Sequence, residues 1–404
     1  MGKCPVLNMA GRYAALPLMA SVLNAPVTRL SERQPGSGLA QDMTDDQTQS
    51  KHHTPINHGG AIDTAAKRYN IPAKNWLDLS TGINPVSCPL GNVDRVHWQR
   101  LPLSAELDAL KQAAKAYYRT PTTKHIVCAP GTQALIQTIP FWLKDQMVST
   151  AETRVHVMGP TYGEHERCWL RAGYQIDCHQ TRPQDRYETA KAILGTAKAG
   201  NVVILVNPNN PDGAMFASTD IVALGGLAAA RGCWLVVDEA FMDCTPDQSV
   251  CADIDQLPTT IVLRSFGKFF GLAGARLGCA VMNTVLASDL ENRIGPWAIP
   301  GPTIVVGTNA FLDTHWQKET RSRLASDALR LDQMVTGNSK LVLSGGTDLF
   351  RYYDGAACSA LADHLAQRGI LVRLFDHDVH KVRFGLPGTP SDWKRLVDAM
   401  ASWV

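Results

Sequence analysis

The amino-acid sequence contains no run of 18 consecutive apolar residues and no tract of clustered lysine and arginine. A membrane-spanning helix needs about 20 predominantly apolar residues, so the first absence argues against a membrane protein. The 39 basic and 37 acidic residues nearly balance, and a net charge of +2 offers little attraction for nucleic acid. With 404 residues, 45% of them hydrophobic, the chain can bury a large core and form two subdomains.

Paired cysteines are also missing, because no two of the ten cysteines are separated by just two residues. Several lie inside apolar runs, where a free thiol behaves as a small hydrophobic group. This scatter favours a reduced, cytoplasmic setting. The segment Asp376-His-Asp-Val-His380 has the composition of a metal cluster, but no other clustered ligands support it. We therefore predict a solvated loop there and no metal site.

The composition of the first residues differs from that of the rest. Residues 31–54 are rich in Ser, Gln, Asp, Gly and Thr, so residues 1–54 are expected to form a disordered extension. No internal repeat is present. We predict that residues 55–90 join a small domain, that residues 91–300 form a large domain, and that residues 301–404 form the small C-terminal domain.

Apolar runs alternate with helical patterns after residue 91. A helix at residues 131–143 directly follows a strand at residues 125–129. Repeated β-then-α units indicate a parallel sheet with helices on both faces, and hence an α/β fold. The break at Pro300-Gly-Pro302 precedes a helical stretch at residues 303–336 and a smaller α+β region. Further strands of the large sheet are expected at residues 154–158, 202–206, 234–237, 260–263 and 277–282.

Two of these strands end in residues with distinctive chemistry. Lys268 lies in a short glycine-bounded loop, and Asp238 follows the apolar residues 234–237. An apolar loop disfavours the charged ammonium, and a neutral lysine amine is what a Schiff base requires. Ser265 and Arg276 flank the lysine, and a hydroxyl with a guanidinium suits a phosphate dianion. An aspartate at a strand end is the partner expected for the ring nitrogen of pyridoxal phosphate (PLP).

A third strand end supports the same site. Residues 202–206 run into Asn207-Pro-Asn-Asn-Pro-Asp-Gly213, which places Asn210 just beyond a strand. Ligands of open α/β sheets bind at the carboxyl ends of the strands. Asn210, Asp238 and Lys268, in that order, therefore predict a PLP enzyme.

These strings resemble a known family. Asn-Pro-Asn-Asn-Pro-Asp-Gly, Asp-Glu-Ala-Phe and Ser-Phe-Gly-Lys-x-x-Gly-Leu-Ala-Gly-x-Arg-Leu-Gly are similar to the fold-type I PLP enzymes of aminotransferase class I/II. The resemblance covers residues 57–404 and implies a large domain with a mostly parallel sheet flanked by helices, plus a smaller α+β domain. Within the family, three strings resemble the threonine-phosphate decarboxylases of cobalamin biosynthesis. They are Asn57-His-Gly-Gly60, Leu77-Asp-Leu-Ser-Thr-Gly-Ile-Asn-Pro85 and Asp238-Glu-Ala-Phe-Met-Asp243.

The resemblance implies which residues hold PLP. Backbone N–H groups at a helix start would bind its phosphate, an aromatic ring would stack on its pyridine plane, and an amide would bond its phenolic oxygen. An aspartate would keep the ring nitrogen protonated, which makes the ring an electron sink. The resemblance assigns the phosphate to Gly131, Thr132 and Gln133, the ring stacking to Tyr162, the phenolic oxygen to Asn210 and the ring nitrogen to Asp238. The remaining cofactor-binding residues are Ser265, Lys268 and Arg276. Lys268, Asp238 and Tyr162 form the catalytic group.

Substrate-binding residues are implied in the same way. Arg383, in Val382-Arg-Phe-Gly-Leu386, matches the family arginine for the substrate α-carboxylate, which a guanidinium fork binds bidentately. Arg373 matches the subgroup's arginine for the substrate phosphate, and His58 is expected near the same phosphate. The other expected substrate contacts are Gly82, Ile83, Asn84 and Asn210.

One position departs from the family pattern. Most members carry Arg-Tyr-Pro before the first helix of the large domain, and that tyrosine reaches the cofactor phosphate of the partner subunit. Here the string is Arg100-Leu-Pro102, so Leu101 has no hydroxyl to make that contact. The resemblance still implies a homodimer.

The resemblance predicts decarboxylation of L-threonine O-3-phosphate to (R)-1-aminopropan-2-yl phosphate and CO2, for the aminopropanol arm of cobalamin biosynthesis. Two alternatives stay open: a histidinol-phosphate aminotransferase, and a non-catalytic PLP-binding partner in the cobalamin pathway. Phe241, where most aminotransferases carry tyrosine, and the His-Gly-Gly entry favour the decarboxylase over the first alternative. Lys268 and Asp238 are both present, which argues against the second.

Overall fold

The computed structural model describes residues 59–146, 153–376 and 378–403. The chain divides into two units, Met1–Thr54 and Pro55–Val404, and the fold described here belongs to the second. The predicted disordered extension, residues 1–54, and His58 both lie outside the described residues. No helix in the described part of the chain is long and apolar enough to cross a membrane.

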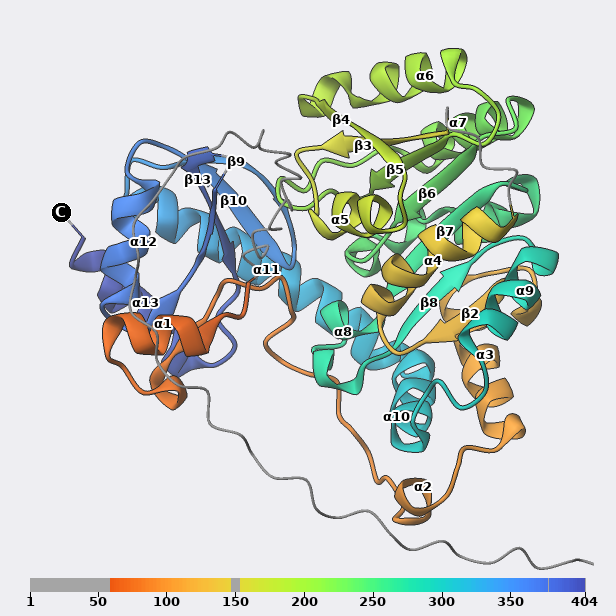
Figure 1. Cartoon of the computed structure of the whole chain (residues 1–404). Helices are drawn as coiled ribbons and strands as arrows, with labels where there is room; N and C mark the ends of the chain where they lie inside the picture. The colour runs from red at the N-terminus through yellow and green to blue at the C-terminus, as the bar shows by residue number, and fades with distance from the viewer. Residues whose placement is uncertain (1–58, 147–152, 377, 404) are drawn as a thin grey trace, which may run out of the picture. The chain divides into compact units, whose positions relative to one another are not determined.

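The larger sheet has seven strands in the order β2-β8-β7-β6-β5-β3-β4 (Figure 1). Neighbouring strands are parallel except at β8, which runs antiparallel to both β2 and β7. Every residue of β5 is buried, as expected for a central strand covered on both faces. The α/β fold class predicted from the sequence is therefore confirmed. The strands are β2 (Ile126–Ala129), β3 (Arg154–Gly159), β4 (Gln175–Gln180), β5 (Val202–Val206), β6 (Trp234–Asp238), β7 (Thr260–Ser265) and β8 (Gly278–Val281).

Helices cover both faces of this sheet. Alternate side chains of β5 enter two separate cores, with Val203 and Leu205 in one and Val202 and Ile204 in the other. The first core is completed by α3 (Ser104–Tyr118), α6 (Arg186–Thr196), α7 (Ser218–Ala230) and α10 (Gly301–Leu312). The second is completed by α4 (Thr132–Gln146), α5 (Glu164–Arg171) and α9 (Thr284–Ile294). The short helices α2 (Val96–Gln99) and α8 (Phe266–Phe269) lie in connections.

A smaller antiparallel sheet has the strand order β12-β13-β10-β9. The N-terminal part of the described chain packs beside it, because β1 pairs in parallel with β11 and places Leu77 opposite Ile370. Trp76 packs there with Ala65 and Ala366. The elements are α1 (Ile62–Tyr69), β1 (Leu77–Asp78), α11 (Thr314–Asn338), β9 (Val342–Thr347), β10 (Phe350–Asp354), α12 (Cys358–Ala366), β11 (Ile370–Leu371), β12 (Arg373–Phe375), β13 (Asp378–Gly385) and α13 (Pro390–Ala401).

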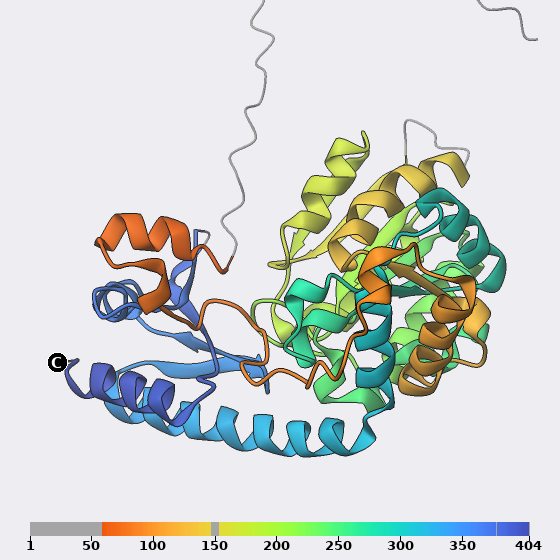
Figure 2. The same ribbon diagram turned by 90° about the horizontal axis from the view of Figure 1, so that it is seen from below.

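The single helical stretch expected at residues 303–336 is wrong, because α10 and α11 are separate helices. Asp313 lies between them, and its carboxylate accepts a hydrogen bond from the backbone N–H of Trp316 at 2.9 Å, which caps α11. α10 packs closely on the large sheet's helix α3, since a Cβ on Gly307 would lie 3.0 Å from Leu110. α11 instead runs toward α13 and the antiparallel sheet (Figure 2). The domain boundary predicted at residues 300 and 301 stays a prediction.

Candidate active site

A cavity of about 580 Å³ lies at the carboxyl ends of the central strands. Val206, Asp238 and Ser265, the last residues of β5, β6 and β7, all contribute to its wall. The structure therefore brings together the polar strand ends recognised in the sequence. Every residue predicted to hold the cofactor lines this cavity: Gly131, Thr132, Gln133, Tyr162, Asn210, Asp238, Ser265, Lys268 and Arg276.

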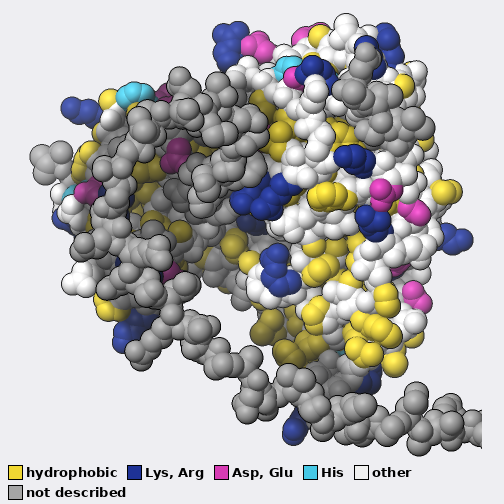
Figure 3. Space-filling view, viewed as in Figure 1, with side chains coloured by type: hydrophobic (Ala, Val, Ile, Leu, Met, Phe, Trp, Pro, Cys, Tyr) yellow, Lys and Arg dark blue, Asp and Glu magenta, His cyan; other side chains and the backbone are white. Residues whose placement is uncertain are grey.

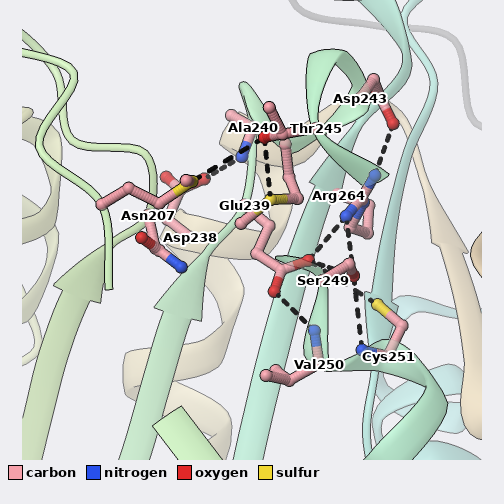
Figure 4. Close-up of polar contacts among 12 residues, drawn as sticks. Asn207, Asp238, Glu239, Ala240, Asp243, Thr245, Ser249, Val250, Cys251 and Arg264 are labelled. Carbon is pink, nitrogen blue, oxygen red and sulfur yellow. Dashed lines mark hydrogen bonds and ion pairs between the residues drawn. The ribbon is translucent and has the colours of Figure 1, made fainter. Parts of the chain in front are cut away.

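Asp238 is a buried carboxylate with defined partners. Its side chain is nearly inaccessible, and one oxygen lies 2.9 Å from Nε2 of His165. The other oxygen accepts a hydrogen bond from the backbone N–H of Ala240 at 3.0 Å, and the Asp238 carbonyl accepts one from Asn207 (Figure 4). Sequence reasoning missed His165. It lies just after Tyr162 at the start of α5, and no motif distinguishes it from an ordinary helical histidine.

A fully buried arginine ties β6 to β7 behind Asp238. Arg264 Nη1 donates to Glu239 Oε2 at 2.6 Å, and its Nη2 donates to Asp243 (Figure 4). Removing one partner of such a buried network leaves an uncompensated charge, which typically costs about 3–5 kcal/mol. Glu239 follows Asp238, and Arg264 precedes Ser265. The network therefore fixes the two strand ends relative to each other.

Lys268 lies on α8, one turn beyond β7. Burial in the cavity, with the nearby Arg383 guanidinium second in effect, lowers the pKa of Lys268 to about 8. Its Nζ lies 5.5 Å from the centre of the Phe241 ring. About a tenth of such a lysine is neutral at pH 7, against a few parts in ten thousand for a lysine of ordinary pKa. The structure thus supplies the uncharged amine that a Schiff base needs.

This pKa predicts how Lys268 reacts in protein stripped of cofactor. Its reductive methylation by formaldehyde and cyanoborohydride should rise with pH to a midpoint near 8, because only the neutral amine attacks the aldehyde. The reference is Nα-acetyl-lysine, with an expected midpoint of about 10.4. Mass spectrometry of the Lys268 peptide after brief treatment at each pH measures the profile. A Lys268 midpoint equal to that of the reference would contradict the prediction.

The start of α4 offers a cradle for an anion. Gly131 precedes the helix in a left-handed conformation, with φ +87°, and a Cβ there would lie 2.5 Å from Arg276 Nη2. A side chain at position 131 would thus both strain the backbone and displace the arginine. The first N–H groups of a helix, here those of Thr132 and Gln133, have no intrahelical acceptor, so they suit a phosphate. The Thr132 hydroxyl is committed elsewhere, since it donates to the Arg264 carbonyl at 3.0 Å.

Tyr162 is held by two neighbours from α4 and α5. Its hydroxyl donates to Gln133 Oε1 at 3.1 Å, and Gln133 Nε2 donates to Glu164 Oε2 at 2.7 Å. Burial, and then the Glu164 carboxylate, raise the pKa of Tyr162 well above its ordinary value, so the phenol stays protonated. Gln133 therefore contributes in two ways: its backbone faces the anion cradle, and its side chain positions the tyrosine.

Two arginines from the small sheet lie side by side near the cavity. Arg383 on β13 is directly opposite Arg373 on β12. Arg383 is 6% exposed; it donates to Asn210 Oδ1 and, at 2.9 Å, to the Ser80 carbonyl. Burial, and then the Arg373 charge, lower the pKa of Arg383 to about 10. The charge of each guanidinium disfavours the charge of the other, so an anionic ligand would stabilise this pair of cations.

The predicted substrate residues from the N-terminal segment are placed differently. Gly82 is wedged between two rings, since a Cβ there would lie 2.8 Å from Phe241 and 3.0 Å from Phe350. The Asn84 side chain donates to the Phe269 carbonyl at 2.9 Å and accepts from Arg323 at 2.7 Å. Gly82, Ile83 and Asn84 do not line the cavity, and neither do Arg373 and Arg383. Their substrate roles stay predictions.

The sequence profile of the aminotransferase class I and II family matches residues 96–400. The chain belongs to this family. A threonine-phosphate decarboxylase of Pseudomonas aeruginosa is 39% identical, covering 85% of this chain and 97% of the relative. A threonine-phosphate decarboxylase of a Sinorhizobium species is 38% identical, covering 86% and 98%. The crystal structure of the histidinol-phosphate aminotransferase from Clostridium acetobutylicum has a TM-score of 0.70 at 20% identity, covering 80% of this chain and 98% of that one, a likeness of fold alone.

These findings confirm the resemblance predicted from the sequence, and they agree with PLP as the cofactor. The residues of this class I and II chain also fit PLP chemically. A buried carboxylate, Asp238, and a lysine that is readily neutral, Lys268, share one cavity with an aromatic side chain, Tyr162. The helix start and Arg276 provide donors for a phosphate at the same cavity.

Proposed function

We propose that this protein catalyses the PLP-dependent decarboxylation of L-threonine O-3-phosphate to (R)-1-aminopropan-2-yl phosphate and CO2. The observation that carries the proposal is the buried Arg383 with the half-buried Arg373 directly opposite it, near the Lys268 cavity. The proposed substrate carries both a carboxylate and a phosphate, so two adjacent cations match its two anionic groups. The names of the two relatives at 38–39% identity support this choice of substrate.

The residues that would hold PLP follow from their positions. Lys268 would bind its aldehyde carbon, Asp238 its ring nitrogen and Asn210 its phenolic oxygen. The amide of Asn210 has its oxygen occupied by Arg383, so its NH₂ group is the end left to donate. The phosphate would lie at the start of α4, with Ser265 and Arg276. PLP, when bound, supplies an electron sink for the bond broken at the substrate α-carbon.

The chain's own residues would select which bond breaks. PLP, when bound, would activate whichever bond at the α-carbon the protein orients for cleavage, so the enzyme would control the reaction by orienting the substrate. Arg383 would hold the carboxylate and Arg373 the phosphate, and two anchors fix the rotation about the bond between the amine nitrogen and the α-carbon better than one. With the carboxylate so held, its bond to the α-carbon would break and CO2 would leave, and Lys268, beside Phe241, would deliver a proton to the α-carbon in its place.

Histidinol-phosphate aminotransferase is the second candidate, because its substrate is also a phosphorylated amine and its fold is shared. That substrate has no carboxylate at its amine-bearing carbon, so the buried Arg383 would have a partner only with the second amino acid of a transamination. A non-catalytic PLP-binding role is disfavoured because Lys268 and Asp238 are both in place. CO2 release from threonine phosphate would identify the decarboxylase. Transamination between histidinol phosphate and 2-oxoglutarate would identify the aminotransferase, and the absence of both activities would leave the non-catalytic role.

The decisive variant is Arg373→Ala. Losing a charge-assisted contact to the substrate phosphate should cost about 2–4 kcal/mol, or roughly 30- to 1,000-fold in kcat/KM for threonine phosphate, mainly through KM. Unphosphorylated threonine should be nearly unaffected by this change. Arg383→Ala is the matched comparison, because both substrates carry the α-carboxylate and both should be weakened. Equal losses for the two substrates in Arg373→Ala would remove Arg373 as the phosphate anchor.

We further infer a homodimer in which exposed apolar residues near α2, α3 and α10 meet a second copy. Four large apolar side chains in this region are each more than half exposed: Trp98, Leu101, Leu103 and Trp297. Exposed apolar patches of this kind mark sites of protein–protein contact. Leu103 and Trp297 share a depression of about 350 Å³. Figure 3 shows hydrophobic side chains gathered on the lower part of one face. Leu101 would add apolar contact there, in place of the family's tyrosine hydroxyl.

Trp297→Lys should shift the protein from dimer to monomer in sedimentation velocity, because a charge in an apolar interface is costly to desolvate. Val285→Lys is the control, since Val285 is also exposed but lies at the other end of α9. Parent protein that sediments as a monomer would exclude the dimer.

The cytoplasmic setting and the place in cobalamin biosynthesis belong to the same proposal, and the free state of all nine described cysteines supports a reducing compartment.

A further inference from the structure

Two loops at the cavity are joined by the side chain of Asn209. The loop after β3 carries Thr161 and Tyr162, and the loop after β5 carries Asn209 and Asn210. Asn209 Oδ1 accepts a hydrogen bond from the Thr161 hydroxyl at 2.7 Å, while its Nδ2 donates to the Pro160 carbonyl at 3.1 Å. Asn209 is 1% exposed. The residues next to the ring-stacking tyrosine and next to Asn210 are thus held by one buried amide.

An ion pair anchors this bridge. Asp212 Oδ1 accepts from Asn209 Nδ2 at 2.8 Å and from the Ala214 N–H at 3.0 Å, which closes the turn around Asn210. Asp212 Oδ2 accepts from Arg186 Nη2 at 2.9 Å. The side chains of Arg186 and Asp212 are 4% and 12% exposed. Arg186 is the first residue of α6, a helix outside the cavity whose Ala190 and Leu194 are buried, so the ion pair ties the turn to a packed helix.

The turn is also confined from the small-sheet side. A Cβ on Gly213, where φ is +71°, would lie 2.2 Å from the Gly346 carbonyl oxygen. Arg383 donates to the Asn210 side chain on the same side. The turn is therefore pressed against β9 on one side and tied to α6 on the other, and none of Arg186, Asn209 and Asp212 lines the cavity itself.

We propose that Arg186, Asp212 and Asn209 form a positioning network that sets Asn210 and Tyr162 at the cofactor together. The carboxylate of Asp212 is the centre of the network, because it orients Asn209 through a hydrogen bond and is itself held by Arg186. The network acts through Asn210, which donates to the ring's phenolic oxygen. This inference rests on PLP binding as proposed above, but it does not depend on which reaction follows.

The test uses the holoprotein and follows its cofactor spectroscopically. The visible absorbance of lysine-bound PLP changes with pH, and the pH at half of that change is the midpoint measured here. A hydrogen bond donated to the phenolic oxygen stabilises its anion, so weakening that hydrogen bond raises the midpoint. Asp212→Asn and Arg186→Met should raise this midpoint by at least about 0.5 pH unit, and Asn210→Ala should raise it further. The visible circular dichroism of the cofactor should weaken in the first two variants, because Tyr162 would no longer be fixed over the ring.

A double-mutant cycle separates positioning from simple stability. In an Asn210→Ala background, Asp212→Asn should move the midpoint by less than about 0.2 pH unit, because the residue it acts through is gone. Arg182→Met is the matched control: its ion pair with Asp185 is just before α6 but exposed, and neither midpoint nor dichroism should change. If the ion-pair variants fail to fold, Thr161→Val removes only the bridging hydroxyl and should still raise the midpoint.

The outcomes leave no ambiguity between this inference and the proposed function. Midpoints in Asp212→Asn, Arg186→Met and Thr161→Val that all equal those of the parent and of Arg182→Met would overturn the network. An equal shift from Asp212→Asn with and without Asn210 would overturn its action through Asn210. Shifted midpoints in a protein that releases no CO2 from threonine phosphate would support the network while refuting the proposed reaction.

Discussion

Lys268→Ala is expected to abolish turnover and to remove the visible absorbance of the purified protein. In the proposed function, the amine of Lys268 would both attach the cofactor and move a proton at the α-carbon, and loss of proton transfer alone costs about 10²–10⁴-fold. Among the described lysines, Lys268 alone lines the cavity. Its pKa, lowered to about 8, leaves far more of its amine neutral near physiological pH than a lysine of ordinary pKa would have.

The measurement is an absorbance spectrum of each variant after incubation with PLP, followed by borohydride reduction and peptide mass spectrometry. Lys394→Ala serves as the control, because Lys394 is exposed, paired with Asp398, and far from any role at the cavity. The control should keep a reduced PLP adduct on the Lys268 peptide. If Lys268→Ala retained a reducible adduct at parental occupancy and full activity, another lysine would be the attachment site.

The cavity residues could be predicted from the sequence because each belongs to a local string at the end of a strand. Asn210, Asp238 and Lys268 follow apolar runs, and parallel strands bring their carboxyl ends to one edge of a sheet. This inference required neither the order of the strands nor the direction of β8. The sequence did not predict that β8 runs antiparallel to its neighbours, and the predicted site did not depend on it.

What the sequence could not supply depends on contacts between distant segments. His165 contacts Asp238 across 73 residues of sequence. Arg186, on α6, contacts Asp212 in the turn after β5. Spacing along the chain gives no distance for such pairs. Strand β4 was also missed, because an edge strand with half-exposed residues lacks the apolar run that marks β5.

The small sheet shows the same limit in another form. Arg373 and Arg383 are ten positions apart, and their opposition depends on a hairpin register that shifts between Leu374 and Phe375. A register slip of one residue would turn one of them to the other face.

Asn84 was predicted as a substrate contact, yet its side-chain amide donates a hydrogen bond to the backbone carbonyl of Phe269, next to Lys268. That contact suggests support for the lysine loop, which a motif match cannot distinguish from substrate binding.

Asp238→Asn is expected to retain PLP but lose most of its catalysis. A neutral amide cannot hold the ring nitrogen protonated, and a charge-assisted hydrogen bond is worth roughly 1.5–3 kcal/mol, or about 10- to 150-fold in rate. The effect should appear in kcat, because the ring must accept electrons only as the bond breaks. Asp247→Asn, the same change at an exposed ion pair with Arg119, should leave kcat unchanged.

His165 sharpens this test. Its Nε2 lies 2.9 Å from the Asp238 carboxylate, so His165→Asn removes a partner of the aspartate while leaving its charge in place. We expect a smaller loss of kcat than in Asp238→Asn, and little further loss when both changes are combined, because the histidine acts through the aspartate. Steady-state rates of the two single variants and the double variant measure the coupling. Activity of Asp238→Asn within about threefold of the parent, a barrier change below roughly 0.7 kcal/mol, would exclude the electron-sink role of Asp238. Fully additive losses would instead show that His165 acts independently of it.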